Sequence, residues 1–261
     1  MKKIRILLLL LLAVLCLTVS RAENEPGIRL NVDQSHAQDG YIIVQRPETD
    51  KKLVVVVEAD DLKTEYPLEN DTVVLPLQFG CQTYHIALFD VSGSGEEASS
   101  LLDSVEFYAD MEDSLSCFLH PNLYVQYTSD SPWVLKAEEL TAGIRDPLKK
   151  YRVIINYIVK EFSYDYIKTV AVKEDHLPDI QRCWDNRMGD SQDLAALVCA
   201  MLRSRGIPAM LFRTADWFTN PYCWIVALIG DDCLAFDPAE KLYVLPKDHM
   251  LFKLYEGAVA Y

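Results

Sequence analysis

The sequence is short of positive charge. Its 25 Lys and Arg residues stand against 39 Asp and Glu residues, which gives the 261-residue chain a formal net charge of −14 at pH 7. An electrostatic field of this sign repels nucleic acid and anionic membrane surfaces. We therefore expect no nucleic-acid partner, and contact with a membrane only through an N-terminal anchor.

Closely spaced metal ligands are also missing. No two cysteines form a CxxC pair, and the five histidines are scattered singly along the chain. Because zinc sites usually draw on such spacings, we predict neither a metal nor a cofactor. Six cysteines follow the first 22 residues: Cys81, Cys117, Cys183, Cys199, Cys223 and Cys233. An even number permits disulfides in an exported protein, but we interpret most of them as small buried apolar residues.

The N-terminus is typical of a signal peptide. Three basic residues precede an apolar run over residues 6–19, which is short for a membrane span. Ser-Arg-Ala at residues 20–22 then offers a cleavage site. Removal of residues 1–22 would change the net charge from −14 to −18. We expect a secreted or cell-envelope protein, with two alternatives: an uncleaved anchor, or lipidation at Cys16.

Residues 23–115 read as all-β. Short β-rich runs lie at residues 41–45, 53–59, 72–77 and 83–89, and Asp, Asn and Gly residues punctuate them. Short strands separated by such turns are typical of a β-sandwich. We predict an immunoglobulin-like β-sandwich domain over residues 23–115, with a structural or binding role.

The spacing of the apolar residues changes in the second half of the chain. We interpret residues 116–140 as a connector, because Pro121 and Pro132 interrupt any regular pattern. Apolar residues at helical spacing then predict a helix over residues 148–161, followed by a loop. Together with the strands expected further on, this indicates an α+β domain over residues 116–261.

The best-marked helix begins at Ser191. Asp190 or Ser191 can act as its N-cap, and Gly206 is the expected residue just past its end. Apolar residues recur along it at i, i+3, i+4, i+7 and i+8: Leu194, Leu197, Val198, Met201 and Leu202. This spacing predicts an amphipathic helix with one apolar stripe.

Strand candidates follow the helix at residues 207–213, 223–229 and 233–236. Gly230 and Asp231 fit a two-residue hairpin turn between the last two. Paired residue numbers should then sum to 461. In this register Tyr222 and Asp237 lie on one face of the hairpin as diagonal neighbours.

This order of elements matches the catalytic layout of papain-type cysteine enzymes. Such enzymes place a Cys at a helix N-terminus, where the helix dipole lowers the pKa of the thiol. A His on a following strand takes the proton, and an Asp or Asn on the next strand orients that His. The corresponding elements here begin at Ser191, begin near Tyr222 and end at Asp237.

The residues in these elements also resemble a known family. The segment from Gly189 through Ser191 to Ala209 resembles the "G-x-C-x-D-x-A-x-L … LLR-x-x-GIPA" pattern of transglutaminase-like domains. Residues 222–224, Tyr-Cys-Trp, resemble the family's "H-A-W" strand, and residues 236–239, Phe-Asp-Pro-Ala, resemble its "F-D-P-T" strand end. The resemblance covers residues 120–245. It implies a papain-like acyl-transfer domain of the kind found in exported bacterial proteins.

The sequence departs from the family pattern at two of its catalytic positions. The nucleophilic Cys of the family corresponds to Ser191, and its general base His corresponds to Tyr222, while the orienting acid is retained at Asp237. A phenol with a pKa near 10 hardly accepts a proton at pH 7. We considered Cys183, Cys199 and Cys223 as substitute nucleophiles, and His176 as a substitute base, and favour none of them.

Three functions are consistent with the sequence. The leading hypothesis is a catalytically degenerate domain, a pseudoenzyme, that binds a peptide, peptidoglycan or protein in the former active-site cleft. The second is an active amide-bond hydrolase or acyltransferase that uses Ser191. The third is a structural scaffold without a ligand. The absence of a His at residue 222 favours the first over the second.

The signal sequence gives the first testable prediction. Cleavage after Ala22 should leave Glu23 as the mature N-terminus, because the basic start, the short apolar run and the small residues before the cut are all present. N-terminal sequencing of the exported protein measures this directly. An intact Met1, or a lipid on Cys16, would contradict the prediction.

Overall fold

The computed structural model describes residues 27–93, 99–171, 176–214, 222–244 and 259–261. The expected signal peptide, residues 1–22, lies outside the described residues. Among the helices that are described, none is long and apolar enough to cross a membrane.

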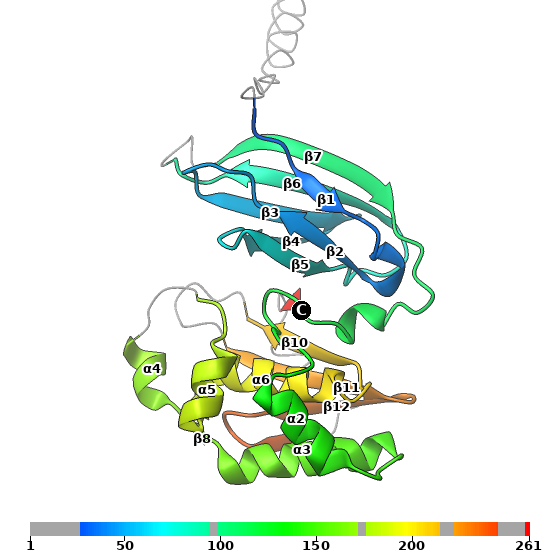
Figure 1. Cartoon of the computed structure of the whole chain (residues 1–261), viewed down its shortest axis with the longest axis vertical. Coiled ribbons are helices and arrows are strands. Elements are labelled where there is room, and N and C mark those ends of the chain that lie inside the picture. Colours follow the sequence, from blue (N-terminus) through cyan, green and yellow to red (C-terminus); the bar gives the residue numbers. More distant parts are fainter. Residues whose placement is uncertain (1–26, 94–98, 172–175, 215–221, 245–258) are drawn as a thin grey trace, which may run out of the picture.

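The N-terminal half consists of two antiparallel sheets (Figure 1). The first has the order β1-β2-β5, with β1 at Asn31–Asp33, β2 at Tyr41–Gln45 and β5 at Thr72–Pro76. The second has the order β4-β3-β6-β7, with β4 at Leu62–Pro67, β3 at Leu53–Ala59, β6 at Thr83–Asp90 and β7 at Ser100–Tyr108. Both sheets contribute buried side chains to one hydrophobic core.

The sequence predicted β2, β3, β5 and β6 but missed β1, β4 and β7. In β4 the buried residues are Thr64 and Tyr66, and the charged residues that alternate with them, Lys63 and Glu65, are exposed. The alternating segment is short and most of its residues are polar, so its composition does not indicate a strand. Asp60 forms the tight turn before β4 with a positive φ of 51°. The immunoglobulin-like character of the two sheets stays a prediction.

The C-terminal half packs helices against a further antiparallel sheet (Figure 1). The helices are α2 (Pro132–Thr141), α3 (Pro147–Glu161), α4 (Tyr166–Ala171), α5 (Ile180–Asn186) and α6 (Ser191–Arg203). The sheet has the order β13-β12-β11-β10-β14, with strands at Leu242–Val244, Asp232–Asp237, Cys223–Ile229, Ala209–Arg213 and Val259–Ala260. A short parallel pair joins β8 (Ser163–Tyr164) to β9 (Met188–Gly189). The chain is therefore a mixed α+β protein.

The expected connector over residues 116–140 is wrong in its second part. Helix α2 starts at Pro132, because proline is well suited to the first position of a helix, where its missing N–H is not needed. The loop expected after α3 likewise contains two helices, α4 and α5. Helix α3 itself lies where the apolar spacing predicted it, and Asp146 caps its start.

The two halves of the chain share one hydrophobic core. Tyr66 of β4 makes an edge contact with the ring of Tyr261, with centroids 5.7 Å apart, and Tyr124 packs on the same ring at 4.3 Å. The N–H of Leu123 donates to the carbonyl of Val74 on β5 over 3.1 Å. The division into domains at residue 115 therefore stays a prediction, since the described contacts continue across it.

Helix α6 differs from its prediction in one respect. Its start and its apolar positions are as expected, but all of its residues are buried, not one stripe of them. The last turn is completed by Gly206, which adopts a positive φ of 73°. Two backbone hydrogen bonds close this turn: the N–H of Gly206 donates to the carbonyl of Arg203, and the N–H of Ile207 donates to the carbonyl of Leu202.

Arg203 connects the end of α6 to distant parts of the chain. Its buried guanidinium donates to the backbone oxygens of Ala209 at 2.9 Å, His120 at 2.7 Å and Tyr261 at 2.7 Å. No salt bridge to a carboxylate is recorded for it among the described residues. The planar fork of arginine fits this set of three acceptors, which a lysine ammonium cannot span.

We predict that Arg203→Lys lowers the free energy of unfolding by about 3 kcal/mol, because charge-assisted hydrogen bonds are lost and their carbonyls stay buried. Urea unfolding of the mature chain measures this. The control is Arg152→Lys on the exposed face of α3, which should change stability by less than about 0.5 kcal/mol. Equal effects of the two substitutions would contradict the role given to Arg203.

Candidate functional site

The N-terminus of α6 is built as a capping box. The Asp190 carboxylate accepts the backbone N–H of Asp193 at 3.0 Å, and the Asp193 carboxylate accepts that of Asp190 at 3.3 Å. Gly189 precedes the cap, and a Cβ at this position would lie 2.7 Å from the Cβ of Asp193 and 2.8 Å from the Sγ of Cys183. Glycine is therefore required here by close packing.

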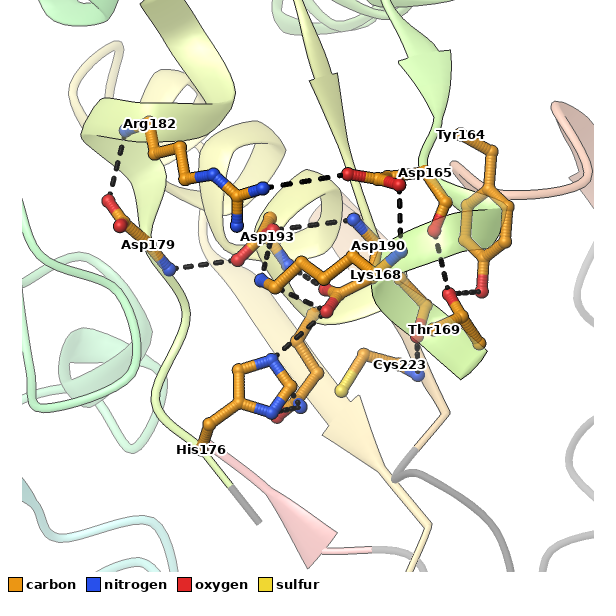
Figure 2. Close-up of polar contacts among 12 residues, drawn as sticks. Tyr164, Asp165, Lys168, Thr169, His176, Asp179, Arg182, Asp190, Asp193 and Cys223 are labelled. Atoms are coloured by element: carbon orange, nitrogen blue, oxygen red, sulfur yellow. Dashed lines mark hydrogen bonds and ion pairs between the residues drawn. The ribbon is translucent and has the colours of Figure 1, made fainter. Parts of the chain in front are cut away.

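A buried lysine forms ion pairs with both of these carboxylates (Figure 2). Nζ of Lys168, from α4, lies 3.0 Å from Asp190 and 2.5 Å from Asp193, and all three side chains are at most 7% exposed. Burial raises the pKa of Asp193, and so does the neighbouring Asp190 carboxylate. Burial alone would lower the pKa of Lys168, but the two carboxylates outweigh it and raise it.

His176 completes the cluster. Its Nε2 lies 3.0 Å from Asp190, and its ring also contacts the side-chain amide of Gln192. Burial by itself would raise the pKa of Asp190, but the hydrogen bond with His176 and the charge of Lys168 hold it at about 2. Asp190 is therefore ionised at neutral pH.

The ligand atoms of His176, Asp190 and Asp193 lie within 4.8 Å of one another, a spacing compatible with a metal ion. However, Nζ of Lys168 already contacts both carboxylates. An ammonium group at this place supplies the positive charge that a cation would bring. We therefore interpret the cluster as an ion-pair network that supports the helix start.

Ser191 is the first residue of α6 and is buried, with 3% of its surface exposed. Its Oγ accepts the backbone N–H of Cys223, the first residue of β11, at 3.2 Å. This contact fixes the helix start against the sheet. Two carboxylates and the single positive charge of Lys168 already lie at this N-terminus. The helix end therefore offers little stabilisation to a further anion.

Tyr222 and Asp237 are joined by a short hydrogen bond. The phenol Oη donates to Oδ2 of Asp237 over 2.5 Å, and Oδ1 accepts the backbone N–H groups of Ala239 and Glu240. Burial raises the pKa of Tyr222, and the Asp237 carboxylate raises it further. The phenol therefore remains protonated at neutral pH and acts as a donor to Asp237.

The hairpin register predicted from the turn is confirmed. Residues Ile225 and Phe236 are paired, as are Ile229 and Asp232, so that paired numbers sum to 461. The structure brings Tyr222 into contact with Asp237, and Ser191 into contact with the residue after Tyr222. The roles of these three residues as nucleophile, base and orienting positions remain predictions.

The substitute groups considered from the sequence lie in different surroundings. Cys183 is fully buried beside Gly189, and burial, with help from Asp193, raises the pKa of its thiol far above the usual range. Burial likewise raises the pKa of Cys199 to about 12. Neither thiol can supply a thiolate at neutral pH. His176 lies against the residues that flank Ser191 in the sequence.

Sequence reasoning missed the part played by Lys168 and Asp193. Asp193 stands at the third helical position, and an acid there after Asp190 is a capping-box signal that was available. Lys168 had no such signal, because it belongs to a separate short helix and meets the carboxylates only in the folded chain.

Comparison with known proteins gives a family match. Residues 136–226 match the model of the transglutaminase-like superfamily, a stretch that includes Ser191 and Tyr222 and ends before Asp237. No curated protein is significantly similar in sequence.

Several solved structures are similar over much of the chain. A candidate cysteine protease from Cytophaga hutchinsonii is 16% identical with a TM-score of 0.41, covering 85% of this chain and 80% of that one. The periplasmic domain of TgpA from Pseudomonas aeruginosa is 15% identical with a TM-score of 0.37, covering 77% and 72%. A candidate protease from Parabacteroides distasonis is 12% identical with a TM-score of 0.33, covering 74% of this chain but 42% of its own.

The buried ion cluster gives a prediction for stability. Lys168→Met should lower the free energy of unfolding at pH 7 by about 3–5 kcal/mol, because it leaves two buried carboxylates uncompensated. The difference in the free energy of unfolding between the native chain and the variant should become smaller as the pH falls towards 5. In the native chain Lys168 lowers the pKa of Asp193, which burial and Asp190 raise, so removing Lys168 raises that pKa further; folding of the variant then takes up a proton there, and acidification favours its folded state more than that of the native chain.

Chemical unfolding of Lys168→Met and the native chain between pH 5 and 7 tests this prediction. The matched control is Lys160→Met, since Lys160 is 82% exposed on α3, and it should cost less than about 0.5 kcal/mol at either pH. A deficit for Lys168→Met that is independent of pH would show that lost packing, not charge, is responsible.

Proposed function

We propose that the part of the chain that matches the transglutaminase-like superfamily, residues 136–226, belongs to a transglutaminase-like domain that is catalytically degenerate. Its role is binding or structural, and it acts at the cell envelope or outside the cell. In the sequence it follows an immunoglobulin-like β-sandwich. The ligand would be a peptide, peptidoglycan or another protein, held where the family's active site lies. Export rests on the signal sequence alone.

One observation carries this proposal. Tyr222, at the position of the family's general base, donates its hydroxyl proton to Asp237 over 2.5 Å. A group that already donates to a carboxylate, and whose pKa is raised, cannot accept a proton from a nucleophile at neutral pH. Asp237 in turn has no imidazole to orient at this position.

The helix N-terminus supports the same conclusion. In a cysteine acyl-transfer site, the positive end of the helix stabilises a thiolate or an oxyanion. Here the first turn already carries the carboxylates of Asp190 and Asp193, with the single charge of Lys168 between them. The hydroxyl of Ser191 lies in an environment that disfavours a developing negative charge.

A second function has one specific observation in its favour. His176 contacts Asp190 at 3.0 Å, so an imidazole and its carboxylate partner stand beside the residue that precedes Ser191. If this pair activated Ser191, the chain would be a serine-dependent amide-bond hydrolase or acyltransferase. Loss of amide hydrolysis or glutamine–amine transfer in both Ser191→Ala and His176→Asn would identify it.

The degenerate site gives a prediction about reactivity. The native chain should show no acyl transfer, whereas Ser191→Cys combined with Tyr222→His should regain a thiolate–imidazolium pair next to Asp237. At about pH 6 this double variant should react with iodoacetamide at least about tenfold faster than Ser191→Cys alone. Neither substitution alone should suffice, because nucleophile and base act together.

The matched control is Ser191→Cys with Tyr222→Phe, which removes the same hydrogen bond to Asp237 without adding an imidazole. The rate of the native chain, in which Cys81 is exposed, is subtracted from each measurement. Ultraviolet absorbance of the thiolate against pH gives an independent reading. Equal rates for the His and Phe variants would mean that residue 222 does not occupy the base position.

A further inference from the structure

A cavity of about 590 Å³ lies between the two halves of the chain. Its walls come from β5 and the turn before it, from residues 121–133, and from residues 178–181 at the start of α5. None of Ser191, Tyr222 and Asp237 lines it. Its volume is within the range of roughly 300–1,000 Å³ typical of ligand pockets.

Two buried side chains in this wall have hydrogen-bond donors without a partner. Nε1 of Trp133 and Nδ2 of Asn122 make no hydrogen bond to the described residues, although the two residues are only 6% and 4% exposed. The amide of Asn122 is held in one orientation, because its Oδ1 accepts the N–H groups of Tyr124 and Val125. Both unpartnered groups can only donate.

The cavity is also lined by the free edge of a sheet. Strand β5 is the outer strand of the order β1-β2-β5. The carbonyl of Asp71 accepts the N–H of Arg46 and therefore points towards β2. The carbonyl of Val74 accepts the N–H of Leu123 and therefore points away from β2. Because backbone groups alternate along a strand, the N–H and C=O of Thr72 point away from β2, to the side of Val74.

The chemistry of the wall narrows the class of ligand. No Lys, Arg or His among the described residues lines the cavity, and Asp179 contributes an acidic group. An anion would therefore be disfavoured, and the donors of Trp133 and Asn122 call for uncharged oxygen acceptors. A peptide offers carbonyl oxygens for these donors and an alternation of N–H and C=O that matches a strand edge. A saccharide offers oxygens but no such alternation.

We propose that this cavity is a binding site for a short, extended, uncharged peptide segment, which pairs with β5 at Thr72 and presents carbonyl oxygens to Trp133 and Asn122. The site is separate from the proposed ligand position near Tyr222. It would remain if the transglutaminase-like site proved to be active.

The experiment uses the mature chain labelled with ¹⁵N at tryptophan. Trp133→Phe assigns the indole N–H signal of Trp133. The probe is a pool of N-acetylated, C-amidated tetrapeptides, randomised at all four positions with uncharged residues. We expect a saturable shift of the Trp133 signal, and an apparent affinity at least about tenfold weaker for a pool with N-methylated backbone amides, since lost backbone hydrogen bonds leave polar groups unpaired.

A matched pair of variants tests the strand edge. Thr72→Pro removes the outward N–H at the first residue of an edge strand, where proline is tolerated, and Thr72→Val keeps it. The Thr72→Val variant should bind the pool as the native chain does, and the Thr72→Pro variant at least about tenfold more weakly.

Three results would overturn the proposal: a Trp133 signal that the peptide pool leaves unshifted, equal affinity for the plain and N-methylated pools, or a shift with a tetramer of N-acetylglucosamine but not with peptides. The pools are applied to the native chain, so the conclusion stands even if the Thr72→Pro variant fails to fold.

Discussion

The burial of α6 on all sides constrains much of the C-terminal half. A helix has backbone N–H groups at its start and carbonyls at its end that lack partners within the helix, and a buried helix cannot leave them all to water. Asp190 and Asp193 bind N–H groups at the start. Their burial in turn requires Lys168 and His176, while Arg203 connects the last turn to the nearby Ala209 and to the distant His120 and Tyr261. These buried polar residues therefore serve the two ends of one helix.

This arrangement separates the shape of the site from its chemistry. The side chains that hold the N-terminus of α6 against β11 have structural roles, and they do not depend on a nucleophile at residue 191 or a base at residue 222. Ser191 itself anchors the helix start through its contact with Cys223. The hydrogen bonds of Ser191 and Tyr222 therefore hold the helix start and the hairpin together whether or not the two residues take part in any reaction.

The sequence predicted the elements whose signals are local. The start of α6 and the hairpin register follow from short motifs, and the contact between Tyr222 and Asp237 follows from that register. Features that depend on residues far apart were not predictable in this way: Lys168 meets Asp193 from another helix. The helix at Pro132 was missed for a different reason, since proline both ends and begins helices, and the apolar spacing after it was too weak to decide.

The contacts of Arg203 have a consequence for the order of events in folding. Its partners His120 and Tyr261 lie 83 and 58 residues away in the sequence, so the guanidinium can exchange its water for these acceptors only when both remote segments have reached the end of α6. Contacts of such long range form late, because loop closure must precede them. Until then α6 would be an exposed apolar helix with a hydrated arginine at its end.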